Sequence, residues 1–404
     1  MYKRARRFTY GFSLFCALLM GVTPSAYAAS GYVWSNSNGS DSGAAWRSVA
    51  MSADGQKLVG VGRTGDIWTS KDYGQTWTDI SLTDTATASK AWASVASSAD
   101  GQKLAAVAFN GDVWTSSDGG DNWTDVSITG SNPAPSGASW YSIASSTDGQ
   151  HLAAADDAGS IWVSTDGGAN WTNRSSVAMS GQAWTSIASS GDGLTLTAVA
   201  FYGKIWVSTD GGLNWTDASV ANPATASRTF WNVTVSSDGS HQGAVTEQGD
   251  IWISTDSGTT WTNVTESNAT MNTRQWNVIT YSPDASLLLV GDYVGDIWSS
   301  YDDGATWTNE STGNAGMGDL IWYSIAISSD NSRIAATAEF SNVWLANNVT
   351  VQNTSGSGGT TPHAPNTGSP RYDTIAPIVI DALLVGSASL ITAGLVMRYK
   401  SRRS

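Results

Sequence analysis

The octet SKDYGQTW, residues 70–77, is one of six copies that share Ser, Asp, Gly and Trp at the same four positions. The other copies are SSDGGDNW from residue 116, STDGGANW from 164, STDGGLNW from 208, STDSGTTW from 254 and SYDDGATW from 300. An Asp two residues before a Gly is typical of a turn in which the carboxylate accepts backbone N–H groups and the Gly takes a positive φ. The Trp then supplies a large ring to bury, with its N–H near backbone oxygens at the edge of the core. We therefore predict a structural role for the six carboxylates, which are Asp72, Asp118, Asp166, Asp210, Asp256 and Asp302.

The tryptophans measure a repeat of about 46 residues. A first Trp opens each unit, a second follows 21 or 22 residues later, and a third closes the octet. Trp34 supplies the third Trp that the last unit lacks, so we expect all 21 tryptophans to fill three positions in seven units. The predicted first tryptophans are Trp46, Trp92, Trp140, Trp184, Trp231, Trp276 and Trp322.

Each unit carries four short strand patterns separated by turn residues. In the first unit these are residues 46–51, 57–62, 67–70 and 77–80. Four strands repeated seven times are typical of a β-propeller. We therefore predict an all-β, seven-bladed propeller over residues 29–350, in which residues 31–37 pair beside residues 343–347 and close the last blade.

The octet resembles the Asp-box of sialidase-like propellers, which also occurs in sortilin-type receptors, xyloglucanase-type enzymes and photosystem II assembly factors. The resemblance covers residue 31 to about residue 349. It implies the propeller fold and says little about function. A calcium role for the boxes is the alternative, but no D-x-D-x-D-G ligand spacing accompanies them. We expect neither a metal nor a cofactor.

The charge balance argues against nucleic-acid binding. The chain has 404 residues with 20 Lys and Arg against 34 Asp and Glu, and eight of the basic residues lie at the extreme termini. The remainder has 12 basic residues against 34 acidic ones, and such a surface repels phosphate. The single cysteine, Cys16, lies in the first 28 residues, so we expect a body without disulfides. We also expect the protein to be a monomer.

The N-terminus has the pattern of a secretory signal peptide. Basic residues precede an apolar run, and an A-x-A site ends at Ala28. We expect residues 1–28 to be removed between Ala28 and Ala29; an uncleaved anchor is less favoured because the apolar run is too short to span a bilayer.

The C-terminus has the pattern of a surface anchor. Residues 351–374 form a Ser/Thr/Gly/Pro-rich stalk, residues 375–397 an apolar transmembrane helix, and residues 398–404 a basic cytoplasmic tail. The segment APNTG resembles a sortase sorting signal of the L-P-x-T-G class, with Ala364 in place of Leu. The resemblance implies cleavage between Thr367 and Gly368 and attachment to the cell wall, whereas the alternative is a permanent membrane anchor. Both place the propeller outside the cell.

Candidate binding residues lie in the turns between the second and third strands, which we call the top face. Exposed aromatic rings beside carboxylates and amides bind sugars or peptide side chains by stacking and hydrogen bonding. The alternative is that these are solvated turns with rings packed between blades. The candidates are Arg63, Phe109, Asn110, Asp156, Asp157, Phe201, Tyr202, Glu247, Asp292, Tyr293, Glu339 and Phe340.

These patterns favour a non-catalytic propeller that binds an extracellular glycan or protein. A purely architectural display module is a further possibility. The enzyme alternative is a sialidase-like glycoside hydrolase, which by resemblance needs an arginine cluster, a Tyr nucleophile with a Glu partner and an acid/base Asp. The body arginines are scattered in the sequence, no [FY]-R-I-P motif is present, and a pair of carboxylates facing across a channel is not visible from spacing.

Overall fold

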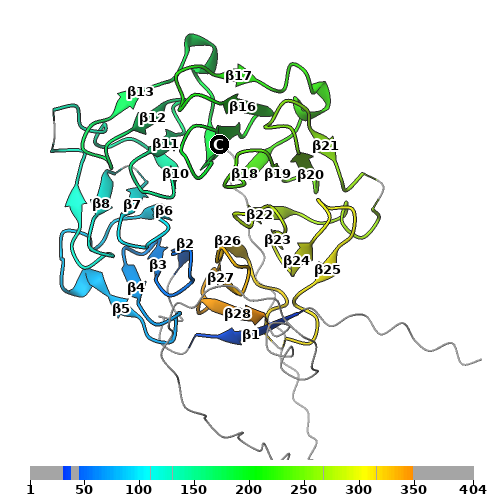
Figure 1. The fold of residues 1–404 in the computed structure, drawn as a ribbon, viewed down its shortest axis with the longest axis horizontal. Helices are drawn as coiled ribbons and strands as arrows, with labels where there is room; N and C mark the ends of the chain where they lie inside the picture. The colour runs from blue at the N-terminus through cyan, green and yellow to red at the C-terminus, as the bar shows by residue number, and fades with distance from the viewer. Residues whose placement is uncertain are drawn as a thin grey trace, which may run out of the picture. The chain divides into compact units, whose positions relative to one another are not determined.

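The computed structural model describes residues 31–37 and 45–348, apart from residues 110, 130, 267 and 315. Seven antiparallel sheets of four strands each follow one another around a ring (Figure 1). This confirms the predicted all-β, seven-bladed propeller.

The strands of blades one to four follow the chain order from the innermost outwards. Blade one consists of β2 (Trp46–Met51), β3 (Leu58–Gly62), β4 (Ile67–Ser70) and β5 (Thr78–Asp79). Blade two consists of β6 (Trp92–Ser97), β7 (Leu104–Ala108), β8 (Val113–Ser116) and β9 (Thr124–Asp125). Blade three consists of β10 (Trp140–Ser145), β11 (Leu152–Asp156), β12 (Ile161–Ser164) and β13 (Thr172–Asn173). Blade four consists of β14 (Trp184–Ser189), β15 (Leu196–Ala200), β16 (Lys204–Ser208) and β17 (Thr216–Asp217).

The remaining blades repeat this order, and the last one combines both ends of the body. Blade five consists of β18 (Phe230–Val235), β19 (Gln242–Thr246), β20 (Ile251–Ser254) and β21 (Thr262–Asn263). Blade six consists of β22 (Trp276–Tyr281), β23 (Leu288–Asp292), β24 (Ile297–Ser300) and β25 (Thr308–Asn309). Blade seven consists of β26 (Trp322–Ile327), β27 (Arg333–Ala338), β28 (Trp344–Asn348) and β1 (Tyr32–Asn36). Short 3-10 turns are η1 (Ile80–Leu82), η2 (Val177–Met179) and η3 (Pro223–Thr225).

The N-terminal strand β1 closes the ring by pairing antiparallel with β28. Trp34 lies opposite Ala346 in this pair and is buried. In Figure 1 the blue β1 lies beside the orange β28. Because β1 covers the outer edge of β28, blade seven has four strands like the others.

Seven clusters of buried hydrophobic side chains hold the blades together, and each cluster draws on two neighbouring blades. The third Trp of a unit packs in the cluster shared with the preceding blade. Trp171 of blade three, for example, lies in one cluster with Val113 and Val126 of blade two. The octet Trp, which was expected to be buried, therefore stabilises the contact between blades.

The assignment of Trp231 to the first Trp position was wrong. Phe230 lies opposite Thr246 at the start of blade five, where Trp46 lies opposite Gly62 in blade one. Phe230 is fully buried, whereas Trp231 is only partly buried and lines a cavity. The interval of 21 residues from Trp231 to Trp252, against 22 in the other units, is the sequence signal of this one-residue shift.

In six of the seven blades, the side chain two residues after the first position joins neighbouring inner strands. The Ser142 hydroxyl in blade three accepts the Ile187 N–H at 3.1 Å and donates to the Ile187 carbonyl at 3.3 Å. Equivalent bonds link Ser324 to Val49 in blade one and Asn232 to the Ile279 N–H in blade six. The Ser in the recurring W-x-S pattern is therefore an inter-blade contact.

No helix in residues 31–37 and 45–348 is long and apolar enough to cross a membrane. The predicted signal peptide, stalk, sorting motif with Thr367 and Gly368, transmembrane helix and basic tail all lie outside the described residues, as do Ala28 and Ala29.

Candidate functional site

A β-bulge interrupts the innermost strand pair of every blade at the residue after the first position. A bulge leaves one residue unpaired and turns its side chain away from the regular alternation. Here the unpaired residues all line one cavity at the centre of the ring. This set, which we call the bulge ring, is Arg47, Ala93, Tyr141, Thr185, Trp231, Asn277 and Tyr323.

A second ring of residues lies above the first, at the top face. In each blade the N–H of the residue after the second strand donates to the carbonyl of the residue before the first strand, for example Arg63 N to Ala45 O at 2.8 Å. This bond holds the top turn over the inner strand. The set, which we call the mouth ring, is Arg63, Phe109, Asp157, Phe201, Glu247, Tyr293 and Glu339.

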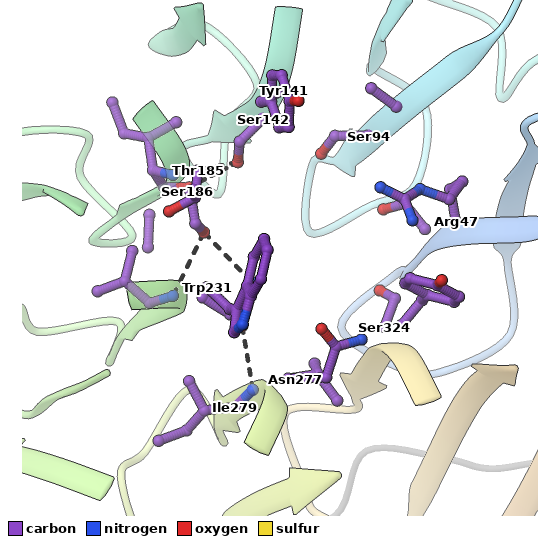
Figure 2. Close-up of a pocket in the computed structure, with 18 of the residues that line it drawn as sticks. Arg47, Ser94, Tyr141, Ser142, Thr185, Ser186, Trp231, Asn277, Ile279 and Ser324 are labelled. Carbon is purple, nitrogen blue, oxygen red and sulfur yellow. Dashed lines mark hydrogen bonds between the residues drawn. The ribbon is translucent and has the colours of Figure 1, made fainter. Parts of the chain in front are cut away.

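The cavity enclosed by these rings has a volume of about 920 Å³. This lies within the range of small-molecule sites, roughly 300–1,000 Å³. Arg63, Phe109, Asp157, Glu247 and Tyr293 of the mouth ring line it together with the whole bulge ring. Figure 2 shows Arg47, Tyr141, Thr185, Trp231 and Asn277 around the open space.

The two arginines of blade one come together at one side of the cavity. The Arg47 guanidinium carbon lies 4.4 Å from the Tyr323 ring centroid and 5.6 Å from that of Phe109. Arg63 reaches the same Phe109 ring at 5.8 Å. Burial lowers the pKa of Arg47, and the neighbouring Arg63 charge adds to this. The arginines that appeared scattered in the sequence therefore include one gathered pair.

Neither arginine of this pair forms an ion pair among the described residues. Two other body arginines do, since Arg228 contacts Asp250 at 2.9 Å and Arg274 contacts Asp292 at 3.0 Å. Asp157 and Glu247, which also line the cavity, come from blades three and five. The site thus has cationic groups on blade one and exposed carboxylates on two other blades.

Two of the candidate carboxylates are structural parts of their turns. Asp156 is buried and accepts the Ser160 N–H at 2.7 Å, and burial raises the pKa of its carboxyl. Asp292 is buried against Arg274, and burial likewise raises its pKa although the arginine opposes the shift. Neither lines the cavity, whereas the next residue of each turn, Asp157 and Tyr293, does.

The remaining candidates lie around the cavity rather than in it. Phe201 packs edge-on against Trp231 with ring centroids 5.3 Å apart, and the exposed Tyr202 packs against Phe201. The Tyr323 hydroxyl lies 3.4 Å from Glu339 Oε2, and Phe340 is 70% exposed. Asn110 lies outside the described residues.

The bulge ring is the part of the site that the sequence interpretation missed. Each member follows the buried first residue of its unit, which makes it the x of W-x-S in five units. This position holds a different residue type in nearly every unit, while its neighbours mostly repeat. That contrast is a signal, but it indicates a cavity only once the bulge is known. In an unbroken strand the same residue would follow the ordinary alternation.

The octets lie at the opposite end of the blades, beside the turns between the first and second strands. The N–H of Gly167 in one octet donates to Gln150 O of such a turn at 2.9 Å. Asp166 accepts the Asn170 N–H at 2.8 Å and the Ser164 hydroxyl at 2.8 Å. Gly168 has φ +94°, and its carbonyl accepts the Trp171 indole N–H at 3.0 Å. The carboxylate is therefore occupied by hydrogen bonds from its own turn.

Within residues 31–37 and 45–348, no cluster of three or more His, Cys, Asp or Glu side chains is arranged to hold a metal ion.

No family model and no curated protein matches this sequence. Solved structures do share the fold. YCF48 bound to D1 peptide superposes with a TM-score of 0.59 at 17% identity, covering 79% of this chain and 97% of that one. YCF48 from Cyanidioschyzon merolae gives 0.59 at 16% identity, covering 78% and 98%. The GH74 xyloglucanase from Xanthomonas campestris gives 0.60 at 15% identity, covering 79% of this chain and 54% of that one.

These neighbours place the chain among seven-bladed propellers similar in fold to YCF48 and to a GH74 xyloglucanase. At 15–17% identity the likeness concerns the fold alone. The chain spans about half of the xyloglucanase. The neighbours include a glycoside hydrolase and a peptide-bound protein, so the fold does not decide between catalysis and binding.

Proposed function

We propose that this protein is a non-catalytic propeller, displayed outside the cell, that binds a glycan or protein partner through the mouth and bulge rings. The observation that carries the proposal is where the repeat varies. The octets, the inter-blade serines and the buried first positions recur around the ring, whereas the two rings that line the cavity change residue type from blade to blade. Variation concentrated at one concave site on a regular scaffold is typical of a binding site.

The chemistry of the lining supports binding. Phe109, Tyr141 and Trp231 offer ring surfaces, and Arg47 offers donors that no carboxylate of the described residues occupies. A YCF48 structure holds a peptide, which is consistent with a protein partner for a propeller of this fold.

The termini support display at the cell surface. A basic and apolar N-terminus ending at Ala28, a Ser/Thr/Gly/Pro-rich segment and an apolar segment with a basic tail match the sequence pattern of export followed by anchoring. We propose that the stalk is cut between Thr367 and Gly368 and joined to the cell wall.

Mass spectrometry of the mature C-terminus tests this anchoring. A chain that ends at Thr367 with cell-wall material attached supports sorting. Peptides from residues 398–404 in mature surface protein would instead mean that the span is retained as a membrane anchor.

A sialidase-like hydrolase is the second candidate, and one contact favours it. Tyr323 lies within hydrogen-bond distance of Glu339 beside the Arg47 guanidinium, and a Tyr–Glu pair and an arginine are among the groups that this chemistry needs. Against it, burial raises the pKa of the Tyr323 phenol, although Arg47 opposes the shift, and a raised pKa disfavours the phenolate nucleophile. The Asp156 carboxyl, whose pKa is raised as in a general acid, is buried outside the cavity.

A glycan array and a panel of labelled glycosides distinguish the two functions. We expect binding by the intact propeller without turnover of the glycosides. Turnover that is lost in Glu339→Gln and in Tyr323→Phe, with folding unchanged, would establish the hydrolase instead.

A further inference from the structure

Blade five differs from the other blades at the cavity, because a Trp, Trp231, occupies its bulge-ring position. In this blade the Trp lies one residue later than the first Trp of the other blades. Phe230 fills the buried first position, and Trp231 belongs to the bulge ring. The core of blade five is complete without the indole, since Phe230, Val233 and Trp261 form its cluster with blade four. The buried core between these blades therefore does not account for Trp231.

The indole is held in place on one side and open on the other. Phe201 packs against it at 5.3 Å with an interplanar angle of 74°. Figure 2 shows the Trp231 side chain projecting into the space between Thr185, Asn277 and the opposite wall. Its N–H is neither buried nor hydrogen-bonded to another described residue. Such a ring, fixed but accessible, is a platform for stacking.

The cavity wall offers side chains rather than backbone to a ligand. In each of six inner strands, one N–H that faces a neighbouring blade already bonds to a Ser or Asn side chain. At these positions the backbone N–H is already occupied, so a peptide strand could not bond to it there. A ligand recognised here needs a ring face together with several hydroxyl or charged groups around it.

The groups around Trp231 fit that requirement. The Asn277 Nδ2 donates to the Trp322 carbonyl at 2.6 Å, and no described residue donates to its Oδ1. Arg47 lies across the cavity on blade one, and Asp157 and Glu247 lie at the mouth. Donors and acceptors therefore surround one aromatic platform.

We propose that the cavity is a saccharide site in which one sugar ring stacks on the Trp231 indole while its hydroxyl or carboxylate groups bond to Arg47 and Asn277. This rests on the proposed binding function and names its ligand class. Sugar rings present a C–H face to the indole and hydroxyls around their edge, which matches the distribution of groups in the wall.

The test measures saccharide binding to the intact propeller by calorimetry and ligand-observed NMR. The probes are oligosaccharides that end in neutral hexoses, N-acetylhexosamines or hexuronates. We expect one class to bind, Trp231→Ala to weaken it at least tenfold, and Trp231→Phe to retain part of the affinity. Arg47→Gln separates the classes, because it weakens a hexuronate strongly and a neutral sugar only a few-fold.

Controls separate loss of the site from loss of the fold. Leu213→Ala removes an exposed apolar side chain from the octet of blade four. The octets lie at the end of the blades away from the mouth ring, so this variant should leave the saccharide affinity unchanged. Trp231→Ala should also keep the melting temperature of the parent, since Phe230 holds the core position.

The outcomes are distinguishable from failure of the proposed function. Saccharide binding that survives Trp231→Ala, or binding of a peptide with no saccharide bound, overturns this inference and leaves a binding propeller. If the propeller binds neither saccharides nor proteins from its surroundings, both the inference and the proposed function are wrong.

Discussion

The octet aspartates show how one residue stabilises a turn without taking part in a site. Asp210 accepts the backbone N–H and the side-chain amide of Asn214, at 2.8 and 2.7 Å, and hydrogen bonds from Asn214 lower the pKa of its carboxyl. The same arrangement recurs at Asp166 with Asn170 and at Asp256 with Thr260. The carboxylate thus accepts hydrogen bonds from N–H groups that have no backbone acceptor within the tight turn.

At this scale we expect Asp166→Ala to lower the free energy of unfolding by about 1 kcal/mol, because turn N–H groups lose their acceptor. Ligand binding should not change, since the octet lies at the end of the blade away from the mouth ring. Urea unfolding and a binding titration measure the two effects separately.

The double variant Phe201→Ala and Tyr202→Ala should weaken ligand binding and leave the free energy of unfolding nearly unchanged, because Phe201 supports the Trp231 indole. If Asp166→Ala abolished binding in a folded protein, the two faces would be assigned the wrong way round.

In six of the seven blades, the inner strand combines a buried first residue, a bulge and an inter-blade side chain. These occupy three consecutive positions, as in Trp140, Tyr141 and Ser142 of β10. The first anchors the strand in the core, the second faces the cavity, and the third bonds to the next blade. One short element therefore supplies stability and a site position together, and the site position is free to vary.

For this element we expect Ser142→Ala to cost roughly 1–3 kcal/mol of stability, because it leaves the buried Ile187 N–H and carbonyl without their partner. Ser180→Ala, at an exposed position after η2, is the matched control and should change stability by less than about 0.5 kcal/mol. An equal effect of both substitutions in urea unfolding would contradict the inter-blade role.

The whole molecule depends on closure by a strand from its own N-terminus. β1 pairs with β28 along five residues, and Tyr32 and Trp34 complete the cluster between blades six and seven. The ring is thereby closed by hydrogen bonds and burial across the two ends of the body, with no disulfide required.

We expect deletion of residues 29–37 to lower the melting temperature and to cause aggregation, since the edge of β28 becomes exposed. Trp34→Ala is the control that keeps the strand while removing the ring, and it should destabilise without causing the same association. Thermal unfolding and size-exclusion chromatography read out both effects. A monomeric deletion variant with unchanged melting would show that closure does not matter.

Much of this architecture follows from the sequence alone, because the buried residues recur at regular intervals along it. A Trp is too large to be placed freely, so its spacing marks each blade, and Trp34 marks the blade assembled from both termini. The octets likewise predict their turns, since such a turn needs a residue with a positive φ and a carboxylate acceptor within a few positions of each other.

The site was decided by tertiary structure. Arg47 and Arg63 lie 16 positions apart in the sequence and meet over Phe109 of the next blade, a contact that only the ring geometry creates. Trp231 and Phe230 are interchangeable to a pattern of apolar residues, and only the β-bulge determines which ring enters the core and which enters the cavity. Local turns and large buried rings are encoded residue by residue, whereas a cavity is a property of seven strands brought together.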